Sequence, residues 1–201
     1  WDGNAVWAKS TEAGPLTDAE SGFASVATGG GAIYAAGLIE GNITDYTFGD
    51  QDVKGSYAGG NALLVKYDSN GNALWARSTA EGINTSEFVS VSVRNNAVYA
   101  AGTIREGDPY IFGTQTVTGP FATHKNALLV KYDANGSALW AKSATTGPDR
   151  SGFNAVAAGS DGAGSGMSAD RIQARTGRCL RHPRGTDWRD CRAERRADRG
   201  P

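Results

Sequence analysis

The stretch NALLVKYDSNGNALWARS, residues 61–78, occurs twice in this chain. It returns 65 residues later as NALLVKYDANGSALWAKS, residues 126–143, with changes only at the positions of Ser69, Asn72 and Arg77. A tract repeated this closely indicates one structural unit that the chain uses again. Such units usually bury their apolar faces against one another, so the repeat decides the architecture.

The same period extends on both sides of this tract. Phe23, Phe88 and Phe153 stand in three similar segments and follow one another at intervals of 65 residues. Residues 32–37 (AIYAAG) return as residues 97–102 (AVYAAG). The sequence therefore predicts a repeat region over residues 1–160. It holds whole units at about 22–78 and 87–143 and partial units at 1–10 and 151–160.

Each unit is predicted to form four short strands. Alternating residues bounded by Gly and Asn favour strands at 23–27, 32–38, 62–67 and 73–78. Residues 67–72 are predicted to join the last two strands as a hairpin, because Asn and Gly tolerate positive φ and an Asp side chain bonds nearby amides.

The segment 38–60 and its equally long counterpart 103–125 vary more than the rest of the unit. Each contains a Phe-Gly pair, at Phe48 and Phe112, followed by a Val and a Gly. We expect decorated loops with room for a small hairpin. Loops of this kind lie on one face of a repeat protein and often carry binding.

Four-stranded units at a fixed period are typical of β-propeller blades, and propellers usually close with about four to eight of them. We therefore expect an all-β fold, an incomplete β-propeller of about two four-stranded antiparallel blades plus flanking strands, cut from a longer gene product. Residues 73–78 are expected at the outer edge of a blade and residues 88–93 nearest the axis. No stretch approaches the roughly 20 apolar residues of a membrane span.

Charge and cysteine usage separate the repeats from the C-terminal segment. Residues 1–170 hold ten Lys and Arg against 17 Asp and Glu, whereas residues 171–201 hold ten Arg, no Lys and four acids. Both cysteines, Cys179 and Cys191, also lie in the second part. We expect the Arg-rich tail, residues 161–201, to be disordered or to come from an out-of-frame reading of its gene. Nucleic-acid binding is the less favoured alternative, because acids interrupt the arginines.

Residues 33–37 (IYAAG), 62–68 (ALLVKYD) and 70–75 (NGNALW) resemble the repeats of bacterial β-propeller proteins of the SBBP type. The resemblance covers residues 1 to about 160. It implies a closed ring of antiparallel blades, an extracellular or cell-surface location in bacteria, and no assigned catalysis. The insertion at 38–60 makes these units longer than the commonest form of that repeat.

The spacing of one set of residues is also similar to the tryptophan-docking pattern of quinoprotein-like propellers. The set is Tyr67, Asp68, Gly71 and Trp75, with counterparts Tyr132, Asp133, Gly136 and Trp140. This resemblance implies that a Gly four residues before a Trp lets the indole dock between adjacent blades. The interval from Asp to Gly is one residue shorter here, and an Asn replaces the usual Thr. Only the packing role of Trp75 and Trp140 is implied, without quinone or calcium ligands.

Trp7, Trp75 and Trp140 recur at one position in each unit. They could form a platform on which sugar rings stack, or they could pack one blade against the next. We favour packing, because a position repeated in every unit is what a repeated interface needs, and one Trp can bury roughly 150–250 Å².

Asp68 and Asp133 also recur, beside Gly71 and Gly136. A calcium site needs about six to eight oxygen ligands, and each turn offers one Asp, one Asn and carbonyl groups. We therefore interpret both Asp residues as stabilising their turns. Lys66 and Lys131 alternate with apolar neighbours and are expected to be solvated.

We assign no catalytic, cofactor-binding or metal-binding residue. His124 has no candidate nucleophile near it in the sequence pattern, so a catalytic role is disfavoured. The structural repeat positions are Trp7, Trp75, Trp140, Asp68, Asp133, Gly71, Gly136, Phe23, Phe88 and Phe153.

The pattern favours a non-enzymatic binding or scaffold module of a bacterial surface or secreted protein, with loops that recognise a protein or a glycan. The expected partners are further blades of the parent chain and such a ligand, with neither a cofactor nor nucleic acid. The alternatives are a propeller enzyme whose catalytic residues lie in other blades, and an array that only spaces other domains.

Overall fold

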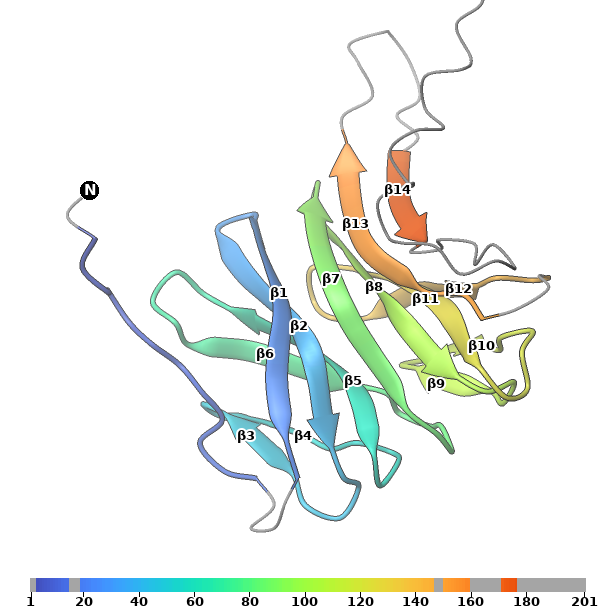
Figure 1. Cartoon of the computed structure of the whole chain (residues 1–201). Helices are drawn as coiled ribbons and strands as arrows, with labels where there is room; N and C mark the ends of the chain where they lie inside the picture. Colours follow the sequence, from blue (N-terminus) through green and yellow to red (C-terminus); the bar gives the residue numbers. More distant parts are fainter. Residues whose placement is uncertain (1–2, 15–18, 147–149, 160–170, 177–201) are drawn as a thin grey trace, which may run out of the picture.

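The computed structural model describes residues 3–14, 19–146, 150–159 and 171–176 (Figure 1). Within these residues every regular element is a β-strand, so the fold is all-β as predicted. The strands form two four-stranded antiparallel sheets, which we call blade 1 and blade 2, and three two-stranded sheets. The two blades correspond to the two whole units of the sequence.

Each blade contains the four strands that the repeat predicts, in the same order. Blade 1 consists of β1 (Ser21–Gly29), β2 (Ala32–Glu40), β5 (Gly60–Tyr67) and β6 (Ala73–Ser78). Blade 2 consists of β7 (Ser86–Arg94), β8 (Ala97–Arg105), β11 (Lys125–Tyr132) and β12 (Ala138–Ser143). β6 and β12 form one edge of their blades, and β1 and β7 form the other.

Both long loops contain the expected small hairpin. In blade 1 the hairpin pairs β3 (Tyr46–Phe48) with β4 (Gln51–Val53), and in blade 2 it pairs β9 (Tyr110–Phe112) with β10 (Gln115–Val117). The turns use Gly49 and Gly113 at φ of 58° and 60°, a conformation that only glycine adopts readily. In Figure 1 the β3–β4 hairpin lies at the bottom of blade 1 and the β9–β10 hairpin lies at the right of blade 2.

The first strands of successive units lie side by side. β7 lies between β1 and β13 (Phe153–Gly159), which is the first strand of a third unit (Figure 1). Each of the three strands has a bulge at the same place, after Phe23, Phe88 or Phe153. The sequence predicts that these first strands lie nearest the axis of the propeller.

Serine hydroxyls connect these inner strands. Ser25 Oγ accepts a hydrogen bond from the Val91 amide at 3.2 Å, and Ser90 Oγ accepts one from the Val156 amide at 3.1 Å. Ser92 Oγ accepts a further bond from the Ala158 amide at 3.0 Å. Both partners of the second bond lie 65 residues after those of the first bond, so the repeat reproduces its contacts as well as its strands.

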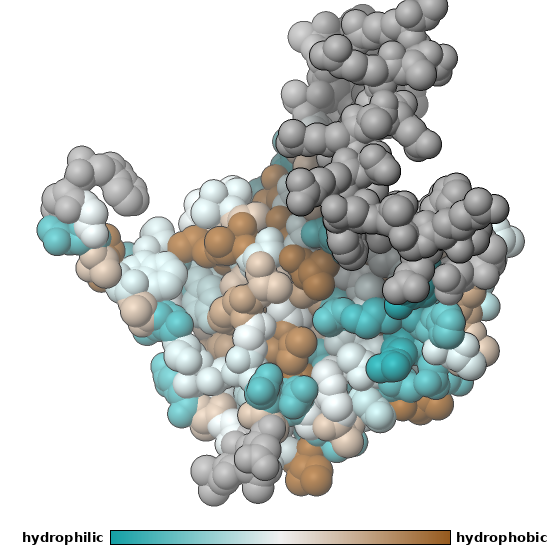
Figure 2. Space-filling model, in the orientation of Figure 1, coloured by the Kyte–Doolittle hydropathy of each residue, from teal (hydrophilic) through white to brown (hydrophobic). Residues whose placement is uncertain are grey.

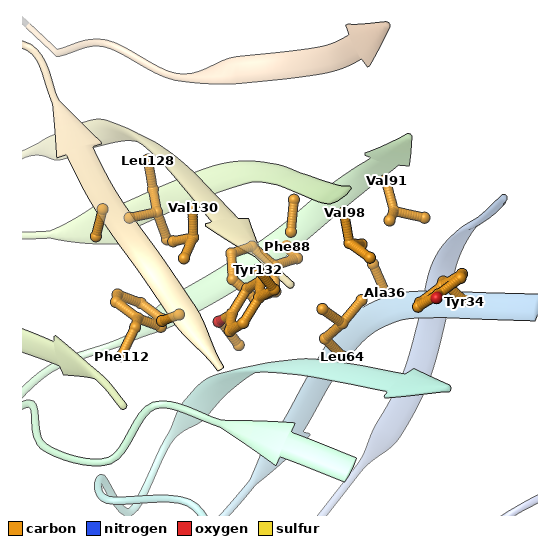
Figure 3. Close-up of a cluster of buried hydrophobic side chains, with 14 of the residues drawn as sticks. Tyr34, Ala36, Leu64, Phe88, Val91, Val98, Phe112, Leu128, Val130 and Tyr132 are labelled. Atoms are coloured by element: carbon orange, nitrogen blue, oxygen red, sulfur yellow. The ribbon is translucent and has the colours of Figure 1, made fainter. Parts of the chain in front are cut away.

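The main core lies between the two blades. Tyr34, Ala36 and Leu64 of blade 1 face Phe88, Val91 and Val98 of blade 2, and all six are buried (Figure 3). Phe112, Leu128, Val130 and Tyr132 of the second unit belong to the same cluster and are labelled in the same view. The prediction that each unit buries its apolar face against the next one is therefore confirmed for this pair.

The chain continues beyond blade 2 with part of a third unit. β14 (Arg171–Thr176) pairs antiparallel with β13, in the arrangement that β8 has beside β7. These six residues lie within the Arg-rich segment. The remainder of the tail prediction, residues 161–170 and 177–201, lies outside the residues that the structure describes.

Candidate functional site

The turn between β5 and β6 is built around the carboxylate of Asp68. Its Oδ1 accepts hydrogen bonds of 2.8 Å from the amides of Asn70 and Asn72, and its Oδ2 accepts one of 2.9 Å from Asn72 Nδ2. The turn of blade 2 repeats this arrangement, since Asp133 Oδ1 accepts from the amides of Asn135 and Ser137. Both carboxylates are occupied within their own turns, which favours the turn-stabilising interpretation over a calcium site.

The hydrogen bonds to Asp68 also affect its ionisation. The bond from the Asn72 amide is the main cause that lowers the pKa of Asp68 below its ordinary value of 3.8. A carboxylate with a lowered pKa stabilises the fold above the pKa of the unfolded chain, and this contribution is lost as the pH falls through the folded pKa. We expect wild type to melt at a higher temperature than Asp68→Asn above about pH 4, and the difference to shrink as the pH falls from there through the folded pKa. Thermal melts of both proteins from pH 7 to pH 2 would measure this, and a difference that persists at pH 2 would contradict it.

The glycine of each turn receives a tryptophan from the preceding unit. A Cβ atom on Gly136 would lie 2.9 Å from the Trp75 ring, and one on Gly71 would lie 2.8 Å from the Trp7 ring. Both glycines have a φ of 81°. The indole Nε1 of Trp75 donates to the Ala134 carbonyl at 3.1 Å, and that of Trp7 donates to the Ser69 carbonyl at 3.1 Å.

Trp75 is 6% exposed and belongs to the core between the blades. Trp140 is half-buried, with its ring centroid 6.3 Å from that of Tyr99. Trp7 and Trp75 thus contact the turn of the next unit, as interface residues do, whereas the ring contact of Trp140 lies within its own blade. This placement favours packing over a sugar platform.

Two cations of blade 1 hold the same turn of blade 2. Lys66 Nζ donates to the Ala134 carbonyl at 2.8 Å, and Arg77 Nε donates to the Gly136 carbonyl at 3.1 Å. The expectation that Lys66 is solvated is wrong, because the neighbouring blade brings a carbonyl oxygen to its ammonium group. Lys131 lies over the Tyr99 ring at 5.3 Å from its centroid.

The bases of the two hairpin loops depend on a buried asparagine. The side chain of Asn61 accepts bonds of 2.9 Å from the amides of Ser56 and Tyr57, and donates to the carbonyls of Gly41, Tyr57 and Gly59. Asn126 is equally buried and bonds the same part of the second loop, through the Phe121 amide and three carbonyls. We did not predict this role from the sequence. The available signal was that both copies of the 18-residue tract begin with Asn.

A tyrosine joins each hairpin to the strands that flank its loop. Tyr110 OH donates to the Arg105 carbonyl at 2.6 Å, and Tyr46 OH donates to the Glu40 carbonyl at 2.7 Å. Burial raises the pKa of Tyr110 to about 12, so this hydroxyl remains a donor through the physiological range. The hairpins are therefore attached to the blades at both ends of each loop.

The linker between the blades brings the two loops together. The amide of Ala80 donates to the Ile111 carbonyl of the β9–β10 hairpin at 2.8 Å, while Ser56 Oγ of the first loop donates to the Gly82 carbonyl at 3.4 Å. One continuous surface results, which we call the rim. It comprises the loops and hairpins at 41–59 and 106–124 and the linker at 79–85.

The rim combines charged groups with two exposed isoleucines. Ile43 is 86% exposed and Ile83 is 68% exposed. Beside the second loop, Lys125 Nζ lies 2.7 Å from Glu87 Oε1. Burial alone would raise the pKa of Glu87, but its hydrogen bonds from Lys125 and Thr103 outweigh burial and lower that pKa.

The described residues contain no group of three or more His, Cys, Asp or Glu residues placed to hold a metal ion. Across the same residues no helix is long and apolar enough to cross a membrane. No protein-family model matches the chain, and no curated protein is similar to it in sequence.

Proposed function

We propose that this chain is a non-enzymatic binding or scaffold module of a bacterial surface or secreted β-propeller protein of the SBBP type. In this proposal the rim recognises a protein or a glycan. The observation that carries it is that two hairpin loops and a linker form one surface on a rigid base. Binding residues are often found on loops that a rigid scaffold positions.

The hydrogen bonds support a rim whose shape exists before a ligand arrives. Asn61 and Asn126 fix the loop bases from buried positions, and the tyrosine hydroxyls fix the hairpins. A preformed surface loses little conformational entropy on binding, which favours affinity. Ile43 and Ile83 supply apolar side chains that a ligand can cover.

The repeated turn residues support the same proposal because they already make contacts that hold the fold together. Asp68 and Asp133 bond their own turns, and Trp75 packs between the blades. A ligand at those positions would have to compete with contacts that hold the fold together. The rim has no such conflict, because its exposed side chains point to solvent.

A screen with a matched control tests this proposal. The full chain would be applied to a glycan array and to an immobilised random-peptide library, and the affinity of each ligand would be measured for two double variants. Ile43→Asp with Ile83→Asp changes the rim. Leu74→Asp with Leu139→Asp changes two exposed leucines on β6 and β12, near the opposite ends of the blades.

We expect the rim variant to lose at least about tenfold in affinity, which corresponds to roughly 1.4 kcal/mol, and the strand variant to bind like wild type. Circular dichroism would verify that both variants remain folded. A ligand whose affinity falls only in the strand variant would contradict the proposal, and so would a screen in which wild type binds nothing.

A further inference from the structure

The side of blade 1 that faces away from blade 2 repeats the surface that blade 2 uses at the interface. We call it the entry face. It consists of Phe23, Val26, Ile33, Ala35 and Tyr67, which line a groove of about 360 Å³ together with Trp7. Their counterparts 65 residues later are Phe88, Val91, Val98, Ala100 and Tyr132, all in the core between the blades.

The aromatic residues of the two surfaces are arranged alike. The ring centroids of Phe23 and Phe48 are 5.8 Å apart, as are those of Phe88 and Phe112. Phe23 meets Tyr67 edge-on at 6.4 Å, and Phe88 meets Tyr132 edge-on at the same distance. The entry face is therefore already shaped as an interface.

The two surfaces differ in what covers them. Phe88 is 1% exposed whereas Phe23 is 42% exposed, and Val91 is 6% exposed whereas Val26 is 65% exposed. Figure 2 shows hydrophobic residues gathered between the N-terminal segment and β7, in the region of the entry face. On blade 2 the cover comes from Tyr34, Ala36, Leu64 and Trp75 of blade 1.

One part of the corresponding cover is present on blade 1. Trp7 docks on Gly71 and donates to the Ser69 carbonyl, as Trp75 docks on Gly136 and donates to the Ala134 carbonyl. Residues 4–10 (NAVWAKS) also match residues 72–78 (NALWARS), which end in strand β6. In the structure residues 4–10 belong to no sheet.

We propose that the entry face binds a three-stranded antiparallel sheet of this same repeat type, and that residues 4–10 become its fourth strand. The incoming sheet would carry Tyr, Ala and Leu at the places of Tyr34, Ala36 and Leu64. The interface between blades 1 and 2 supplies the template for this contact. This inference does not depend on the rim, because the entry face shares no residue with the rim and would bind a different partner.

The test adds the partner to the full chain. A copy of residues 21–68 joined to Trp1 supplies three strands and keeps the length of the turn, because Gly3 and Asn4 then follow at the spacing of Gly71 and Asn72. Val26→Cys, in a background with Cys179→Ser and Cys191→Ser, reports exposure of the entry face through its rate of alkylation. Amide hydrogen exchange reports strand formation at residues 6–10.

In the extended chain we expect alkylation of Val26→Cys in the original unit to slow by about tenfold or more, and exchange at residues 6–10 to slow by a similar factor. The added copy would keep valine at the equivalent place. A control extension with Tyr34→Asp and Leu64→Asp in the added copy alone should leave both rates unchanged.

Three results would overturn the proposal. The first is an unchanged alkylation rate beside a folded added sheet. The second is an added copy that stays unfolded, because the identical sequence folds as blade 1. The third is alkylation of the unextended chain that slows as protein concentration rises, with dimers in light scattering, since a second copy would then be the partner.

Discussion

Replacing Trp75 by alanine is expected to lower the free energy of unfolding by about 3–5 kcal/mol, the usual range for a buried Trp or Phe. The indole lies in the core between the blades, contacts Gly136, and donates to the Ala134 carbonyl. Its removal leaves a cavity, and the half-buried Ala134 carbonyl then keeps only its hydrogen bond from Lys66. Urea unfolding followed by circular dichroism would measure the change.

Trp7→Ala is the matched control, because Trp7 makes the same two contacts with the turn of blade 1 but is only half-buried. We expect less than half of the loss caused by Trp75→Ala. A loss of under about 1 kcal/mol for Trp75→Ala, well below the range for a buried Trp, would point instead to an exposed ligand platform.

Asn61→Ala is expected to destabilise the chain by about 3 kcal/mol, because each buried donor left without a partner costs roughly 1–3 kcal/mol. The substitution removes the oxygen that accepts from the amides of Ser56 and Tyr57. The first loop should loosen before the blades do. Hydrogen exchange at these two amides is therefore expected to accelerate more than exchange in β2.

Asn42→Ala is the control for this prediction. Asn42 lies in the same loop and donates to the Ser56 carbonyl at 3.3 Å, but from an exposed position. We expect a loss of less than about 0.5 kcal/mol, as for most surface substitutions. Equal losses for the two variants would show that the bonds of Asn61 do not hold the loop.

The strands could be predicted because their signal is local. Alternation along each strand, the Asp-x-Asn-Gly turn and the 65-residue period all lie in contiguous sequence. Repetition then added long-range information, since a second copy of a strand set implies a second blade. The order β1-β2-β5-β6 and its copy in blade 2 follow from hairpin connections between neighbours.

The residues that hold the loops and turns across the interface could not be predicted in the same way. Lys66 alternates like a solvated strand residue, and only the arrival of the next blade places the Ala134 carbonyl beside its ammonium group. Asn61 reads as an ordinary polar residue at the start of a strand. Its role requires that residues 41, 56 and 59 return to it through a loop, which no local pattern specifies.

The serine bonds between inner strands have a consequence for the behaviour of the chain in concentrated solution. An edge strand with free amides offers a template to which another polypeptide can add and from which fibrous aggregates can grow. The amides of Val91, Val156 and Ala158 are instead satisfied by hydroxyl groups of the preceding unit. Each unit thus protects the backbone of its successor against templated misassembly.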